Sequence, residues 1–300
     1  MKKAINLLFM LLLFPFAEAQ EMYTEKYIPE GKDLESLKFE SKILKGTEKY
    51  SIYLPPDYQI SNRRYPVVYL LHGLSDNEMG WIQFGEVNTI ADKAIAEREI
   101  PPVIIVMPDG GVTWYINDSQ NQYRWNDMFT QEFIPYIDAT YRTRPAKEFR
   151  AIAGLSMGGY GALINALLHP DLFSSCVAFS AAVFTDDELV AMAGSEYARR
   201  FSKLTDINLK GRERLTSYWQ DHSILNLMKT LPKVKTTSVR WYIDCGDDDH
   251  LYKGNENLHI LMRDLNIPHE YRVRDGAHTW TYWRTGLPDG LKFIGEGFHR

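Results

Sequence analysis

The feature that most constrains this chain is a serine set between glycines near its middle. Residues 149–162 read FRAIAGLSMGGYGA, in which an apolar run precedes a Gly-x-Ser-x-Gly turn and a run suited to a helix, 160–168, follows. A strand, a sharp turn and a helix form a nucleophile elbow, which lifts the serine Oγ clear of its sheet. Because the turn strains the serine backbone, the flanking glycines avoid collisions that a Cβ would make. The pattern therefore predicts that Ser156 is a nucleophile.

Around the elbow, strand-like runs alternate with helical stretches. The run 65–71 is continuously apolar, as expected of a strand that is buried on both faces. Such alternation predicts an α/β fold with a mostly parallel central sheet flanked by helices. We expect strands at 65–71, 102–107, 151–153, 175–181, 239–245 and 269–274, helices at 86–98, 129–141, 160–168 and 257–265, and two antiparallel strands within 37–54 that turn at Gly46.

The chain has the length and composition of one large domain. Its 300 residues are 45% hydrophobic and 13% aromatic, enough for a sizeable core. The segment 184–235 is polar and helix-prone and lacks a strand of the core type, so we expect a helical cap-like insertion there. The net charge of -5 and the absence of a basic run argue against a nucleic-acid partner.

The N-terminal residues have the features of an export signal. Two lysines precede an apolar stretch at 5–16, and Ala-Glu-Ala at 17–19 is a cleavage site of the A-x-A type. The apolar stretch is shorter than the about 20 residues that a membrane span needs. We expect residues 1–19 to be a cleaved signal peptide, residues 20–300 to form the mature domain, and the protein to be periplasmic or secreted without a membrane span.

The two cysteines are expected to remain unpaired. Cys176 falls near the start of one predicted strand, and Cys245 falls at the end of another. If these strands are parallel neighbours, the two residues are displaced by roughly 13 Å along the sheet. A disulfide requires Cα atoms within about 7 Å, so we predict two buried free thiols.

A serine nucleophile needs a histidine base and an acid that orients it. In chains of this topology the acid and then the histidine follow the serine. His278 follows the predicted strand 269–274 and precedes the C-terminal helical region, whereas the rival His72 precedes the serine. The backbone at 72–74 is better suited to an oxyanion hole, whose expected donors are the N–H groups of Leu74 and Met157.

The acid is expected among the aspartates that follow the strand at 239–245. Asp244 still belongs to that strand, so its side chain is poorly placed to reach a histidine loop. Of the others we favour Asp249, with Asp247 as the alternative. Clustered aspartates also bind cations or cap helices, but calcium usually takes a longer ligand set, so we expect no metal.

Four motifs together resemble one known family. The segments YLLHGL, GLSMGGYGAL, IDCGDDDHLY and GAHTW look like those of the esterase D and feruloyl esterase group, the carbohydrate esterase family one type of α/β-hydrolase. The resemblance implies an α/β-hydrolase fold and a serine esterase that needs no cofactor. It maps the triad onto Ser156, His278 and Asp249, the third residue after the strand-end glycine. It also places the oxyanion donors at Leu74 and Met157.

Two features favour a substrate in plant cell walls: the predicted export of the protein, and the aromatic residues near the motifs. Sugar rings and cinnamoyl groups both bind flat aromatic faces. We therefore expect a feruloyl or acetyl-xylan type of esterase acting on polysaccharide esters. The alternatives are a siderophore-ester hydrolase or an acyltransferase of the same family, and a non-catalytic carbohydrate-binding protein on this scaffold. The candidate substrate-binding residues are Trp81, Trp114, Trp125, Trp280 and Trp283.

Overall fold

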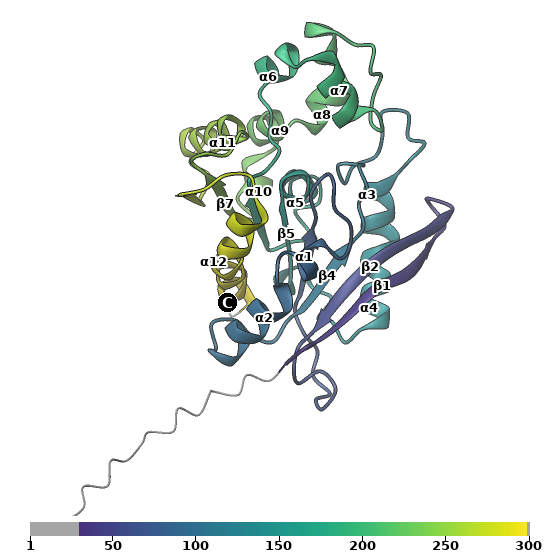
Figure 1. The fold of residues 1–300 in the computed structure, drawn as a ribbon, viewed down its shortest axis with the longest axis vertical. Helices are drawn as coiled ribbons and strands as arrows, with labels where there is room; N and C mark the ends of the chain where they lie inside the picture. Colours follow the sequence, from purple (N-terminus) through teal and green to yellow (C-terminus); the bar gives the residue numbers. More distant parts are fainter. Residues whose placement is uncertain (1–29, 299–300) are drawn as a thin grey trace, which may run out of the picture.

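A single eight-stranded sheet organises the molecule (Figure 1). The structure, a computed structural model, describes residues 30–298. The sheet order is β1-β2-β4-β3-β5-β6-β7-β8, in which β1, β2 and β4 pair antiparallel and the remaining neighbours pair parallel. The mostly parallel α/β sheet is therefore confirmed. The strands are β1 (Lys32–Ser41), β2 (Gly46–Leu54), β3 (Val67–Leu71), β4 (Ile104–Pro108), β5 (Arg150–Leu155), β6 (Ser175–Phe179), β7 (Arg240–Gly246) and β8 (His269–Arg274).

Each central strand is buried on both faces, which explains its continuous apolar sequence. In β3, Val67, Tyr69 and Leu71 belong to one core cluster, whereas Val68 and Leu70 belong to the other. Successive side chains of a strand point to opposite faces, so a strand covered on both sides needs apolar residues throughout.

Helices form the two outer layers. On one face lie α3 (Trp125–Met128), η1 (Phe129–Phe133), α4 (Ile134–Thr140), α5 (Met157–Leu168) and α11 (Tyr252–Asp264). On the other lie α1 (Gly80–Gln83), α2 (Val87–Ala96) and α12 (Trp280–Phe298), of which α2 and α12 are adjacent (Figure 1). A short 3₁₀ turn, η2 (Lys147–Phe149), precedes β5.

Several of the expected boundaries differ from the observed ones, and two of the differences have a clear local description. The helix expected at 257–265 begins at Tyr252, because Gly254 lets its backbone pass against the carbonyl of Val183 where a Cβ would collide. The hairpin turn expected at Gly46 falls earlier. Residues 42–45 form it, with Lys45 in the left-handed region at φ 55°, and Gly46 already begins β2.

The expected helical insertion between β6 and β7 is confirmed. Figure 1 shows its first helices gathered beyond one end of the sheet. Tyr197 and Phe201 anchor this cap, since both side chains are buried and the Phe201 ring stacks on Trp114 at 5.0 Å between centroids. Its elements are α6 (Asp186–Ala191), α7 (Gly194–Phe201), η3 (Gly211–Arg214), α8 (Ser217–His222), α9 (Ile224–Thr230) and α10 (Lys233–Thr236).

The cysteine prediction is confirmed as well. Cys176 and Cys245 are both buried free thiols. Strands β6 and β7 are parallel neighbours, and Cys176 is paired with Trp241 rather than with Cys245. Among the residues that the structure describes, no helix is both long enough and apolar enough to cross a bilayer. The predicted signal peptide, residues 1–19, lies outside the described residues.

Candidate active site

Ser156 occupies the turn between β5 and α5. Its backbone has φ 55° and ψ -118°, a conformation that residues other than glycine rarely adopt. Two hydrogen bonds hold it there: the Ser156 N–H donates to the carbonyl of Phe179 at 2.9 Å, and the Ala182 N–H donates to the carbonyl of Ser156 at 2.9 Å. The strained turn is thus fixed by the neighbouring strand β6 and the loop after it.

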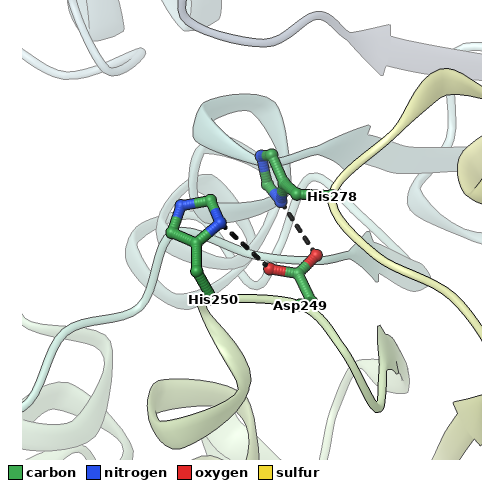
Figure 2. Close-up of side chains that lie close together, drawn as sticks. All are labelled: Asp249, His250 and His278. Atoms are coloured by element: carbon green, nitrogen blue, oxygen red, sulfur yellow. Dashed lines mark hydrogen bonds and ion pairs between the residues drawn. The ribbon is translucent and has the colours of Figure 1, made fainter.

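The side chains of Ser156, His278 and Asp249 form a continuous hydrogen-bonded chain. His278 Nε2 lies 2.9 Å from Ser156 Oγ, and His278 Nδ1 lies 2.8 Å from Asp249 Oδ2. Figure 2 shows the imidazole of His278 directed at the carboxylate. With the Nδ1–H donating to the carboxylate, Nε2 presents its lone pair to the serine hydroxyl. This tautomer is the one that can accept the serine proton.

Asp249 is buried in a site that favours its ionised form. Burial by itself raises the pKa of this carboxyl. The hydrogen bond and charge of His278, together with the Leu251 N–H that donates to Oδ1 at 2.8 Å, outweigh burial and hold the pKa below its usual value. The carboxylate is therefore an acceptor that keeps the imidazole in one orientation.

The other two aspartates considered from the sequence have separate partners. Asp244 is fully buried and bonds to Arg274 and to the Tyr282 hydroxyl, so it stabilises the sheet edge. Asp247, the alternative acid, accepts a hydrogen bond from the Gly276 N–H at 2.9 Å. It therefore holds the loop that carries His278 and does not contact the imidazole itself.

His72 is held in the core and is not available as a base. The Gly110 N–H donates to His72 Nε2 at 2.8 Å, so Nδ1 carries the proton and donates to the carbonyl of Gly73 at 2.7 Å. These bonds fix the chain at the start of the predicted oxyanion loop.

The predicted oxyanion donors lie beside the serine. Leu74 lines the same pocket as Ser156, and Gly73 approaches so closely that an added Cβ would lie 3.8 Å from the Ser156 Cβ. Met157 is the first residue of α5, where a backbone N–H has no partner within the helix. The N–H groups of Leu74 and Met157 thus both belong to backbone segments next to Ser156.

Two of the five candidate tryptophans line the pocket. Trp280 is half-buried there and packs against the exposed ring of Phe84, with 5.7 Å between ring centroids. The Trp283 ring meets the His278 imidazole edge-on, with 4.8 Å between ring centroids.

The structure corrects the prediction for the other three tryptophans. Trp81, Trp114 and Trp125 are at most 2% exposed. Each indole N–H donates to a backbone carbonyl, of Leu71, Arg200 and Asp109 respectively. These side chains belong to the core, because the bulk of an indole is most stable where its surface is removed from water.

Sequence reasoning missed Ser180, a buried serine that acts on the Asp249 carboxyl. The Ser180 hydroxyl is fully buried and accepts a hydrogen bond from the Trp283 indole N–H at 3.0 Å, and it helps to lower the pKa of Asp249. Its backbone φ of 44° is left-handed. No local sequence pattern predicted a role for Ser180, because a serine after a strand is common. The residues that Ser180 contacts also lie far from it in the sequence.

The pocket above Ser156 has a volume of about 410 Å³. Besides the groups already described, it is lined by Arg199 and Arg200 from α7 of the cap and by His250. His250 lies next to Asp249 and His278, with its Nδ1 3.7 Å from Asp249 Oδ1 and its ring 4.6 Å from that of His278 (Figure 2). Burial and the neighbouring His278 charge lower the pKa of His250, which favours its neutral form.

Asp249, His250 and His278 also bring ligand-type atoms within 4.8 Å of one another. The Asp249 oxygens accept from His278 Nδ1 and from the Leu251 N–H. Because ligation would have to displace the bond to His278, we assign this group to hydrogen bonding.

The carboxyl ends of parallel strands bring all these groups to one edge of the sheet. Ser156 follows β5, Asp249 follows β7 and His278 follows β8. In open α/β sheets, ligands bind outside this edge where the strand order reverses, which here is around β3. Fold and site together define an esterase of the α/β-hydrolase class.

Comparison with known proteins identifies the family. The Esterase family model matches residues 41–294, so the chain belongs to this family, and it is a serine carboxylic-ester hydrolase. The chain is 25% identical to an acetyl esterase of Caldicellulosiruptor saccharolyticus over 274 residues, covering 87% of this chain and 97% of the relative. It is 29% identical over 180 residues to an endo-1,4-beta-xylanase/feruloyl esterase of Xylanibacter ruminicola, covering 58% of this chain and 25% of that longer protein.

A solved structure of a ferulic acid esterase superposes with a TM-score of 0.75. Its sequence is 31% identical, and the match covers 90% of this chain and 99% of the other. The similarity therefore covers most of the chain.

Proposed function

We propose that the chain hydrolyses esters through a catalytic triad of Ser156, His278 and Asp249. The observation that carries this proposal is the unbroken chain of hydrogen bonds from the Asp249 carboxylate through the imidazole to the serine hydroxyl, at 2.8 Å and 2.9 Å. Each contact lies within the range in which a base can take the proton of a nucleophile.

The reaction proceeds in two acyl-transfer steps. His278 takes the proton of Ser156 as Oγ attacks the ester carbonyl, and the N–H groups of Leu74 and Met157 stabilise the tetrahedral oxyanion. His278 then donates the proton to the leaving alcohol, and an acyl-enzyme remains. Water, activated by the same imidazole, releases the acid and restores the serine.

We further propose that the substrates are esters of plant cell-wall polysaccharides, with a feruloyl or an acetyl group on the sugar. The pocket is lined by the indole of Trp280, which packs against the ring of Phe84, and flat apolar faces bind both sugar rings and cinnamoyl rings. Similarity to proteins named acetyl esterase, ferulic acid esterase and xylanase/feruloyl esterase supports this substrate class. The N-terminal signal pattern supports export to the periplasm or the medium.

Two substrates and one variant test the proposal. Hydrolysis of methyl ferulate and of 4-nitrophenyl acetate is measured for the native protein and for Ser156→Ala. We expect serine-dependent turnover, with kcat at least ~10³-fold lower in the variant and an unchanged circular dichroism spectrum. Rapid turnover of ferulate indicates a feruloyl esterase, whereas turnover of the acetate alone indicates acetylated polysaccharide. A Ser156→Ala enzyme with near-native activity would refute the triad.

A further inference from the structure

The charged groups that line the pocket are divided between its two sides. Asp76 belongs to the loop after β3, on the side of the predicted oxyanion hole. Arg199 and Arg200 come from α7 of the cap. The cap side of the pocket therefore carries positive charge above the serine.

Arg200 is already committed to holding the cap in place. Its Nε donates to Glu196 Oε1 at 2.9 Å, its guanidinium lies over the ring of Phe184, and its carbonyl accepts the Trp114 indole N–H at 2.7 Å. These bonds, with the buried rings of Tyr197 and Phe201, fix the position of α7. The backbone of α7 is thus held in place, and so is the point from which the Arg199 side chain extends.

Arg199 has no such partner. Within residues 30–298 its guanidinium makes no ion pair or hydrogen bond, and the side chain is exposed where it lines the pocket. A guanidinium presents N–H donors in a planar fork that matches the two oxygens of a carboxylate. Because the guanidinium is exposed to water, leaving it unpaired costs the empty enzyme little desolvation free energy. It is therefore available to bind a ligand.

We propose that Arg199 forms a subsite for a carboxylate on the substrate, so that the enzyme prefers acidic esters to their neutral counterparts. This inference rests on the proposed function, because the subsite serves the reaction at Ser156. The carboxylate belongs either to a uronic acid of the polysaccharide or to the acyl group, and both present the same chemistry to Arg199. His250, which follows Asp249 in the chain and also lines the pocket, supplies a further hydrogen-bond donor at the pocket wall.

Two matched pairs of substrates distinguish the sources. For the alcohol side, acetylated methyl glucuronoside is compared with acetylated methyl glucoside. For the acyl side, monomethyl adipate is compared with methyl hexanoate. Each enzyme is characterised by the ratio of kcat/KM for the acidic member to that for the neutral member, so the neutral ester is an internal reference. We expect a ratio of about ten or more at low salt in one pair, falling as NaCl is added.

The decisive variant is Arg199→Gln, with Arg212→Gln as the matched control. Arg212 is an exposed arginine of the same cap that does not line the pocket, so its loss changes net charge equally. We expect Arg199→Gln to lower the ratio at least about fivefold, and Arg212→Gln to keep it. Preference in the alcohol pair assigns the carboxylate to the sugar, and preference in the acyl pair assigns it to the acid.

Three results would overturn the subsite: no acidic preference in the native enzyme, an unchanged ratio in Arg199→Gln, or an equal fall in Arg212→Gln. Failure of the proposed function is recognised separately. In that case the neutral esters also show no turnover that depends on Ser156.

Discussion

The indole N–H of Trp283 donates to the hydroxyl of Ser180 at 3.0 Å, and that hydroxyl helps to hold the pKa of Asp249 below its usual value. Two further buried side chains, Ser180 and Trp283 of α12, thus stand behind the proposed triad. Trp283 also packs edge-on against the imidazole of His278. Trp283 therefore contacts both the base and the serine that influences the acid.

Removing the Ser180 hydroxyl is expected to loosen Asp249 without removing it. A hydrogen bond to a charged group contributes about 1.5–3 kcal/mol, so Ser180→Ala should lower kcat about tenfold while KM for 4-nitrophenyl acetate is retained. Ser175→Ala is the control, because Ser175 is buried in β6 and its hydroxyl has no partner in the described part of the chain. Equal losses in both variants would show that Ser180 acts only through stability.

The two acidic residues near His278 should respond very differently to the same substitution. Asp249→Asn removes the charge that fixes the imidazole tautomer, and we expect kcat to fall by about 10³-fold or more. Asp247→Asn keeps an oxygen that can accept from the Gly276 N–H, so its effect should be mild. Steady-state kinetics on 4-nitrophenyl acetate measure both, and the reverse order would transfer the role of acid to Asp247.

The elbow should not tolerate a methyl group at Gly158. A Cβ there would collide with the backbone carbonyls of Leu71 and His72, which cannot move without shifting β3. We expect Gly158→Ala to cost about 1–3 kcal/mol or more of unfolding free energy and to reduce activity. Gly194→Ala at the start of α7 meets nothing within 4 Å and is expected to be neutral or slightly stabilising. Urea denaturation of both variants tests the contrast, and equal stability would contradict it.

Stability should depend on pH through Asp33 in β1. Burial raises the pKa of this carboxyl to about 6. The carboxylates of Glu35 and Asp92 add to the increase, and a hydrogen bond from Asn88 opposes it. In the unfolded chain an aspartate titrates near 3.9, so between about pH 4 and pH 6 the native state binds more protons and stability falls as pH rises.

Asp33→Asn removes this titration. We therefore expect the variant to gain stability relative to the native protein at pH 7, and to gain less at pH 4.5. Urea unfolding at the two pH values provides the comparison. A stability difference that is the same at both would show that the Asp33 carboxyl does not titrate between them in the native state.

The sequence by itself determined the class of the fold and the order of the chemical groups. Continuous apolar runs such as 65–71 predicted strands buried on both faces, and the glycines around Ser156 predicted the elbow, because both depend on sterics and burial within a few residues. His278 and Asp249 were predicted from their order along the chain and from family resemblance. Their contact at 2.8 Å required the tertiary structure.

Only the tertiary structure decided which polar and aromatic groups reach the site. Trp81, Trp114 and Trp125 are near the motifs in sequence, yet the fold turns them into the core, whereas Trp283 reaches both Ser180 and His278. Arg199 enters the pocket because the buried rings of the cap fix α7 above the serine. The physical reason is that such contacts join residues far apart in the chain, so they depend on how strands and helices pack and not on any local pattern.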